Sequence, residues 1–160
     1  MNELWDTSLK GGMQTIEGKV ADLTDFFECH PIMDNGEFFW EGIRFLPVQT
    51  IHIVSGRKFQ NSYGLLMIEN NIRKAFLTTD TQYAPYQLNG FYSGSEFIFH
   101  DCETSPFRSN VHAHYDDLKT LPQDTKSRMW LYHYNQDVPP QDAVADGFAG
   151  FVKKGQSFDL

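Results

Sequence analysis

The sequence predicts a mixed fold, α+β or layered α/β, in which helices flank one mixed sheet. Short runs rich in β-branched and aromatic residues dominate the chain from residue 43, and helical patterns stand between the later runs. Polar residues follow several of these runs, as is typical of folds whose sites lie at strand ends. With 160 residues, 41% of them hydrophobic, the chain is long enough to form a single domain over 1–160.

The first half of the chain reads as follows. Apolar residues at helical spacing in VADLTDFFE, 20–28, predict a short helix. An Asn-Gly pair inside CHPIMDNGEFF, 29–39, predicts a hairpin, because this dipeptide favours tight turns between strands. A strand is expected over 43–54. Two further runs flank the Asn-Asn pair at 70–71 and predict a second hairpin, which ends near Asp80.

In the second half, strands alternate with short helices. EFIFHDCET, 96–104, predicts a buried strand, and HYDDLKTLP, 114–122, predicts a helix that stops at its proline. SRMWLYHYN, 127–135, predicts another strand. The glycine-rich tail over 147–160 predicts the last short strands.

Charge and composition narrow the class of protein. A formal net charge of −8 disfavours a surface for duplex DNA or an anionic membrane, although a local basic pocket could still hold a small phosphate ester. Two cysteines give no disulfide framework, and the first ten residues lack the apolar core of a secretory signal. No apolar run has the length of a membrane span, so we expect a cytoplasmic protein.

Candidate site residues stand at or near the ends of predicted strands. They are His52, Asp80, Asp101, Glu103 and His133. Each of them alone is more often a hydrogen-bonded or turn residue than a ligand. The order His, Asp, His on successive strands favours a metal site, because imidazole and carboxylate are the usual ligands of zinc, iron or manganese.

The stretch SNVHAHYDDL is one residue short of the paired-metal motif H-x-H-x-D-H. It contains His112, His114, Asp116 and Asp117, and its last Asp stands where that motif needs a His. One alternative is a mononuclear site of two histidines and a carboxylate that uses His112 and His114. For Glu103 and His114, a simpler interpretation is a salt-bridged helix start, in which the stretch DCETSPF supplies capping oxygens to the following turn.

Several stretches together carry a family resemblance. VQTIHIV, SYGLLMI, FLTTDTQYAP, FIFHDCET, VHAHYDDL and MWLYHY resemble, in order and spacing, the C-terminal half of a metallo-β-lactamase-fold hydrolase. The nearest branch holds tRNA 3′-processing endonucleases and phage-type phosphodiesterases that act on cyclic nucleotides. ELWDTSLKGGM resembles the segment that follows the first metal motif in that branch. The resemblance implies part of an αββα sandwich.

The resemblance also implies metal ligands. His52 matches the third histidine of the first metal site, Asp80 the carboxylate that bridges two metals, and His133 the terminal ligand of the second site. Zn²⁺ or Mn²⁺ is the implied cofactor.

The resemblance further implies a catalytic pair, for which two assignments stay open. His114 or His112 matches the histidine that protonates the leaving group. Glu103 or Asp101 matches the acidic partner of that histidine. The HAHYDD stretch is then a look-alike of the metal motif, because it follows Asp80 instead of preceding His52.

The implied function is metal-dependent hydrolysis of phosphodiester bonds in a cyclic nucleotide or RNA. Because no H-x-H-x-D-H precedes His52, we expect a truncated or split form with an incomplete two-metal site, which needs a complementing chain. Whether the chain alone is an enzyme stays open, and a non-catalytic binding module that retains the fold is the main alternative. A homo-oligomer is also expected.

A missing layer would expose apolar side chains on one sheet face. The candidates for that face are Phe38, Trp40, Phe45, Leu66, Phe76, Phe97, Phe99, Trp130 and Tyr132.

Overall fold

The computed structural model describes residues 2–33, 35–135, 139 and 141–160. The chain divides into two compact units, 1–33 and 34–160, which are described separately below. The single domain expected over 1–160 stays a prediction. Of the helices in the described ranges, none has the length and hydropathy needed to cross a membrane.

The first unit contains short helical segments, a two-stranded sheet and one 3₁₀ turn. These are α1 (Asn2–Leu4), η1 (Trp5–Leu9), α2 (Lys10–Met13), β1 (Thr15–Ile16), β2 (Lys19–Val20) and η2 (Leu23–Asp25). The helix predicted over 20–28 is therefore a single turn. Asp22 caps that turn, because its carboxylate accepts the Thr24 N–H and the Asp25 carboxylate accepts the Asp22 N–H.

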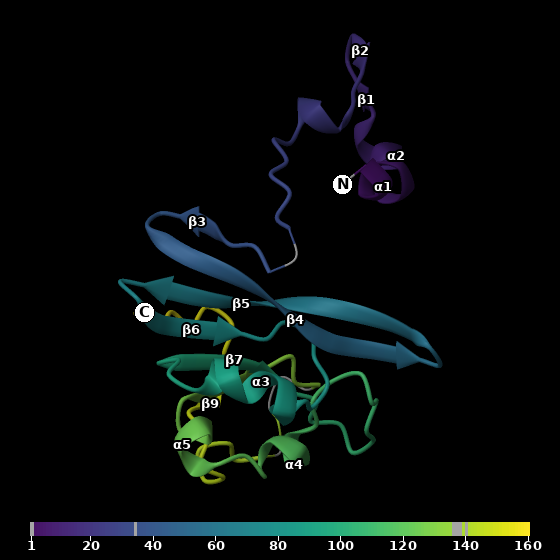
Figure 1. Ribbon diagram of the computed structural model, residues 1–160. Helices are drawn as coiled ribbons and strands as arrows, with labels where there is room; N and C mark the ends of the chain where they lie inside the picture. The colour runs from purple at the N-terminus through teal and green to yellow at the C-terminus, as the bar shows by residue number, and fades with distance from the viewer. Residues whose placement is uncertain (1, 34, 136–138, 140) are drawn as a thin grey trace. The chain divides into compact units, whose positions relative to one another are not determined.

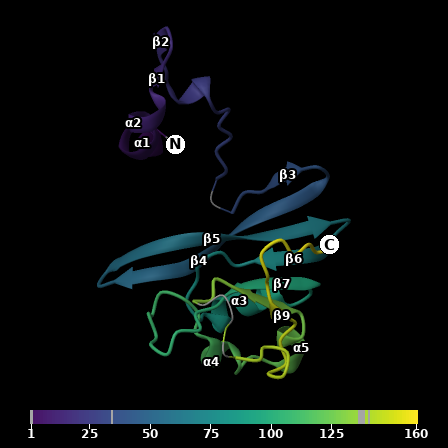
Figure 2. The ribbon, with the colours of Figure 1, turned by 180° about the vertical axis from the view of Figure 1, so that it is seen from behind.

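Within its described residues, the second unit is a seven-stranded mixed sheet with three short helices (Figures 1 and 2). Its elements are β3 (Phe38–Trp40), β4 (Ile43–Ser55), β5 (Lys58–Glu69), β6 (Ile72–Leu77), α3 (Pro85–Tyr92), β7 (Phe97–Asp101), α4 (Tyr115–Leu118), α5 (Gln123–Lys126), β8 (Met129–Tyr132) and β9 (Gly150–Phe151). The strands follow chain order across the sheet, antiparallel from β3 to β6 and parallel from β6 to β9. The predicted mixed sheet with flanking helices is confirmed.

One hairpin prediction is confirmed and one is wrong. Asn70 and Asn71 connect β5 to β6, with φ of 50° and 63°, as a two-residue turn with two left-handed positions requires. The hairpin predicted within 29–39 does not form, because residues 29–33 contain no strand. The turn lies instead at Glu41 and Gly42, between β3 and β4, with φ of 51° and 83°.

The sheet has one face packed under helices. Leu66, Phe76 and Ile98 point to this face and pack with Leu88 and Tyr92 of α3. All five side chains are at most 2% exposed. The expectation that Leu66 and Phe76 belong to an uncovered face is therefore wrong. Phe45 alternates with the core residues Leu46 and Val48 on β4, so it points to the opposite face, where its ring stacks on Phe38 and is 8% exposed.

The opposite face carries a separate aromatic row. Phe97, Phe99 and Trp130 alternate with the core residues along β7 and β8, so they point away from the helices. The ring of Phe158, near the C-terminus, packs edge-on against Phe99 and Trp130, with centroids 4.8 and 5.0 Å apart. A segment of the chain itself thus covers part of this face.

The two cysteines should differ in reactivity. Cys29 is exposed, whereas Cys102 is buried beside β7, and burial raises the pKa of its thiol. We expect iodoacetamide to modify Cys29 alone in the folded protein and both residues in denaturant, as measured by mass spectrometry of peptides. Rapid modification of Cys102 under native conditions would contradict the burial of this residue, which directly follows Asp101 at the end of β7.

Candidate metal centre

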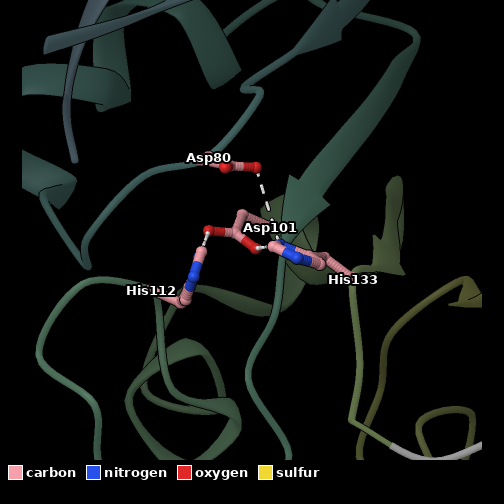
Figure 3. Close-up of side chains that lie close together, drawn as sticks. All are labelled: Asp80, Asp101, His112 and His133. Atoms are coloured by element: carbon pink, nitrogen blue, oxygen red, sulfur yellow. Dashed lines mark hydrogen bonds and ion pairs between the residues drawn. The ribbon is translucent and has the colours of Figure 1, made fainter.

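Two aspartates and two histidines converge at one edge of the sheet (Figure 3). Asp80 follows β6, Asp101 ends β7 and His133 follows β8, so three adjacent parallel strands deliver them to the same edge. His112 joins them from the loop between β7 and α4. One potential ligand atom from each residue lies within 4.8 Å of the others.

Asp101 connects the two histidines. Its side chain has no exposed surface, yet its carboxylate has three donors. Oδ2 accepts the Thr81 N–H at 2.9 Å and Nδ1 of His112 at 2.7 Å, and Oδ1 accepts Nδ1 of His133 at 3.0 Å. These bonds stabilise a carboxylate whose burial would otherwise be costly. Because each Nδ1 carries the donated proton, Nε2 of both rings is left as the free nitrogen.

Asp80 lies on the solvent side of Asp101 and His133. Its side chain is 45% exposed, and its oxygens are 3.5 Å from Nδ1 of His133 and 3.8 Å from Nε2 of His52. The other ring nitrogen of His52 donates to the carbonyl of Val111 at 3.1 Å. That bond holds the ring with Nε2 directed at Asp80, as hydrogen bonds commonly do for histidine ligands. Whether His52, Asp80 and His133 share a metal stays a prediction.

A β-bulge presents His52. On β4, Ile51 pairs with Asn61 and Ile53 pairs with Gln60, so His52 is the extra residue between two consecutive pairs. A bulge redirects one side chain and leaves its backbone groups without a ladder partner. The bulge therefore explains how a histidine in the middle of a long strand reaches the end of the neighbouring ones.

Two site residues have left-handed backbone conformations. Thr79, next to Asp80, has φ of 54°, and His133 has φ of 66°. For a β-branched residue such as Thr79 this conformation is strained, at a cost of about 1–3 kcal/mol. Thr78 stabilises the same turn, because its Oγ1 accepts the Asp101 N–H at 3.0 Å and donates to the Thr79 carbonyl at 2.9 Å. Strain of this kind commonly accompanies functional sites.

A buried pair supports β7 from the helix side. His100 has no exposed surface, and burial lowers the pKa of its imidazole below the usual value. The neutral ring uses both nitrogens, since Nδ1–H donates to the Asp101 carbonyl and Nε2 accepts the Tyr92 hydroxyl, each at 2.7 Å. This pair joins α3 to the strand end that carries Asp101.

Glu103 and His114 lie apart from the cluster. Glu103 accepts the backbone N–H and the hydroxyl of Ser109, and so closes the loop that leads to His112. His114 caps α4 by accepting the Asp116 N–H, and its Nε2 contacts the Ser105 carbonyl at 3.0 Å. Both ring nitrogens of His114 thus have local partners.

The donor set can hold a divalent cation. Imidazole nitrogens and carboxylate oxygens suit Zn²⁺, Mn²⁺ and Fe²⁺, and four of them come within coordination reach of one another. Across the part of the chain that the structure describes, this is the one group of acidic, histidine and cysteine side chains with such spacing.

Removing the charge of Asp101 should destabilise the protein. In Asp101→Asn an amide NH₂ would replace one acceptor and oppose a donor, so we expect a loss of about 1–3 kcal/mol in the free energy of unfolding, measured with urea. Asp116→Asn is the control, because its side chain is 67% exposed, and it should change stability by less than about 0.5 kcal/mol. Equal effects in both variants would contradict the central role given to Asp101.

The chain was compared with known proteins. The model of a family described as "Anti-Pycsar protein Apyc1" matches residues 1–158. A protein of that name from Bacillus phage vB_BsuM-Goe3 is 28% identical over 144 residues, which cover 84% of this chain and 53% of the relative. Another from Paenibacillus xerothermodurans is 28% identical over 173 residues, which cover 100% of this chain and 61% of the relative. The chain therefore spans somewhat more than half the length of these curated relatives.

Two solved structures share the fold. A diphosphatase described as belonging to the PhnP family superposes with a TM-score of 0.58 at 21% identity, over 83% of this chain and 50% of that one. YhfI from Bacillus subtilis, a metallo-β-lactamase fold protein, superposes with a TM-score of 0.57 at 13% identity, over 78% of this chain and 52% of that one. The sheet is thus part of a metallo-β-lactamase fold, and from the match over residues 1–158 the chain belongs to the anti-Pycsar protein Apyc1 family.

Proposed function

We propose that this chain forms the metal-binding and proton-transfer part of a phosphodiesterase that acts on cyclic nucleotides. The observation that carries the proposal is the junction of His112 and His133 on one buried carboxylate, Asp101, beside the accessible carboxylate of Asp80. Family membership adds support, because the resemblance to phage-type phosphodiesterases implies the same chemistry.

His52, Asp80 and His133 would hold the metal. A divalent cation bound there would polarise a phosphoryl oxygen and lower the pKa of a bound water. Asp101 would act through His133, whose Nδ1–H it accepts, by fixing the orientation of that ring.

His112 is the proposed proton donor, with Asp101 as its partner. Asp101 accepts Nδ1–H of His112, which fixes the tautomer and the orientation of the ring. When water attacks phosphorus and the ester P–O bond breaks, Nε2–H of the protonated ring would give its proton to the departing oxygen. The direct contact between His112 and Asp101 supports this assignment over His114 and Glu103, which bond within their own loop.

A cyclic nucleotide fits the surroundings better than a long nucleic acid. A polar pocket of about 250 Å³ adjoins His112 and is open to solvent. The net charge of −8 disfavours an extended polyanion but not a small ester held at a cation. The anti-Pycsar family also supports a small cyclic substrate.

We also propose that full activity requires ligands from polypeptide outside these 160 residues. A two-metal site of the resembled kind uses an H-x-H-x-D-H motif, which this sequence lacks before His52. A second copy of the chain could cover the aromatic face, whereas only polypeptide that carries this motif could complete the site. The alternative, a binding module without catalysis, is favoured by the small number of ligands gathered in the cluster.

Zinc binding should depend on the cluster. We expect His133→Ala and Asp80→Ala each to weaken Zn²⁺ binding by at least about tenfold, measured by isothermal titration calorimetry, because each removes a direct ligand. His30→Ala is the matched control, since His30 is exposed and lies in the first unit. Unchanged affinity in the two site variants would assign the zinc to another place.

The chain alone should hydrolyse phosphodiesters weakly or not at all. We expect turnover of bis(p-nitrophenyl) phosphate and 3′,5′-cyclic mononucleotides, with added Zn²⁺ or Mn²⁺, to appear on mixing with a family fragment that carries H-x-H-x-D-H. That activity should be lost in Asp80→Ala. Strong turnover by the unmixed chain would overturn the need for complementation, and no turnover in a mixture with bound metal would favour the binding module.

A further inference from the structure

The side-chain amide of Gln82 lies where three segments of the candidate site meet. Its Nε2 donates to the carbonyl of His52 at 3.0 Å and to the carbonyl of Asn110 at 2.6 Å. Its backbone N–H donates to the carbonyl of Ile51 at 2.7 Å. Gln82 itself follows Asp80 by two residues, so one residue links the segments that carry His52, Asp80 and His112.

Both carbonyls that Gln82 reaches lack a partner in the sheet ladder. His52 is the extra residue of the β4 bulge, so β5 does not pair with it. Asn110 lies in the loop before His112 and has a left-handed φ of 60°. The His52 carbonyl is partly buried, so leaving it without a partner would be unfavourable, whereas the Asn110 carbonyl is exposed. One donor that bonds to both carbonyls holds the two segments in place.

A primary amide is the group that this position requires. Glutamine offers two N–H donors on one nitrogen, which match two carbonyl acceptors. A carboxylate of the same shape offers none and would face both carbonyls with like partial charge. The bond from His52 Nδ1 to Val111, beside Asn110, joins the same two segments a second time.

We propose that Gln82 is a positioning residue that sets the geometry between His52 and His112. It acts through the backbone, by fixing the bulge that presents one ring and the loop that presents the other. The rings of these two histidines lie 5.2 Å apart, so a small displacement of either segment changes their relation. This inference rests on the proposed function only for the roles of the two histidines. The hydrogen bonds of Gln82 themselves do not require a bound metal.

The test compares two substitutions at Gln82 with one at Gln87. Gln82→Glu keeps the shape and reverses the hydrogen bonding, and Gln82→Met removes the donors without adding acceptors. Gln87→Glu is the matched control, because Gln87 likewise donates its amide to a β4 carbonyl, that of Gln49 at 2.9 Å, but from α3. Each protein is studied as the metal-free full chain, and its unfolding midpoint is recorded.

Two spectroscopic readouts decide the matter. Long-range ¹H–¹⁵N NMR should show the His52 ring protonated at Nδ1 in the wild type and a shift toward the Nε2 form in both Gln82 variants. Hydrogen exchange of the amides over 109–113 should accelerate by on the order of tenfold in these variants, as expected for the loss of two hydrogen bonds. Gln87→Glu should leave both readouts at wild-type values.

The outcomes separate this proposal from the proposed function. If both folded Gln82 variants retain the wild-type His52 tautomer and loop exchange, Gln82 does not position the histidines and the proposal is overturned. Should Gln82→Glu fail to fold, Gln82→Met gives the decision. Absence of zinc binding by the wild type would count against the metal proposal alone, because neither NMR readout involves a metal.

Discussion

The burial of one carboxylate constrains the whole candidate site. An isolated charge such as that of Asp101 is costly to bury, and the cost falls only when donors approach from fixed directions. Here the donors are the N–H of Thr81 and the rings of His112 and His133. They come from three segments far apart in sequence. The order of β6, β7 and β8 in the sheet and the course of residues 105–113, in the loop between β7 and α4, therefore both have to place a donor at Asp101.

The backbone irregularities around the site are consequences of the same constraint. Regular strands would carry Thr79 and His133 past the edge of the sheet, whereas left-handed residues at these positions turn the chain back over Asp101. The bulge at His52 does the equivalent on β4, and Gln82 satisfies the carbonyl that the bulge leaves free. Packing on the helix side, through Leu66, Phe76 and their neighbours, provides the stability that supports this local strain.

The sequence allowed prediction of features that depend on local chemistry. The Asn70-Asn71 hairpin follows from turn preference, and the strand ends that carry Asp80, Asp101 and His133 follow from β-rich runs. Features that depend on tertiary contacts could not be predicted. The hairpin predicted from the Asn-Gly pair within 29–39 does not form, and the turn lies at Glu41 and Gly42 instead. The reason is that the strand that pairs with β4 starts only at Phe38.

The choice between His112 and His114 illustrates the same limit. Both are histidines in one short stretch, and only the loop closed by Glu103 and Ser109 decides which ring faces Asp101. The side chains predicted for one exposed sheet face in fact belong to two faces, and the cause is related. Alternation gives the faces within one strand, but the relation between strands depends on register, which a single sequence does not reveal.

All three hydrogen-bond donors to Asp101 lie inside this chain. The arrangement around Asp101 therefore does not depend on the further ligands proposed above. The carboxylate, the two histidines and the Thr81 N–H can adopt their arrangement when the sheet and the 105–113 loop form. If another polypeptide supplied further ligands, the residues around Asp101 would already be ordered. Less conformational entropy would then be lost on binding than is usual. Because the accessible side chains are those of Asp80 and His133, any additional ligand would approach from the solvent side of Asp101. A centre of this kind would gain chemistry on completion without having to refold.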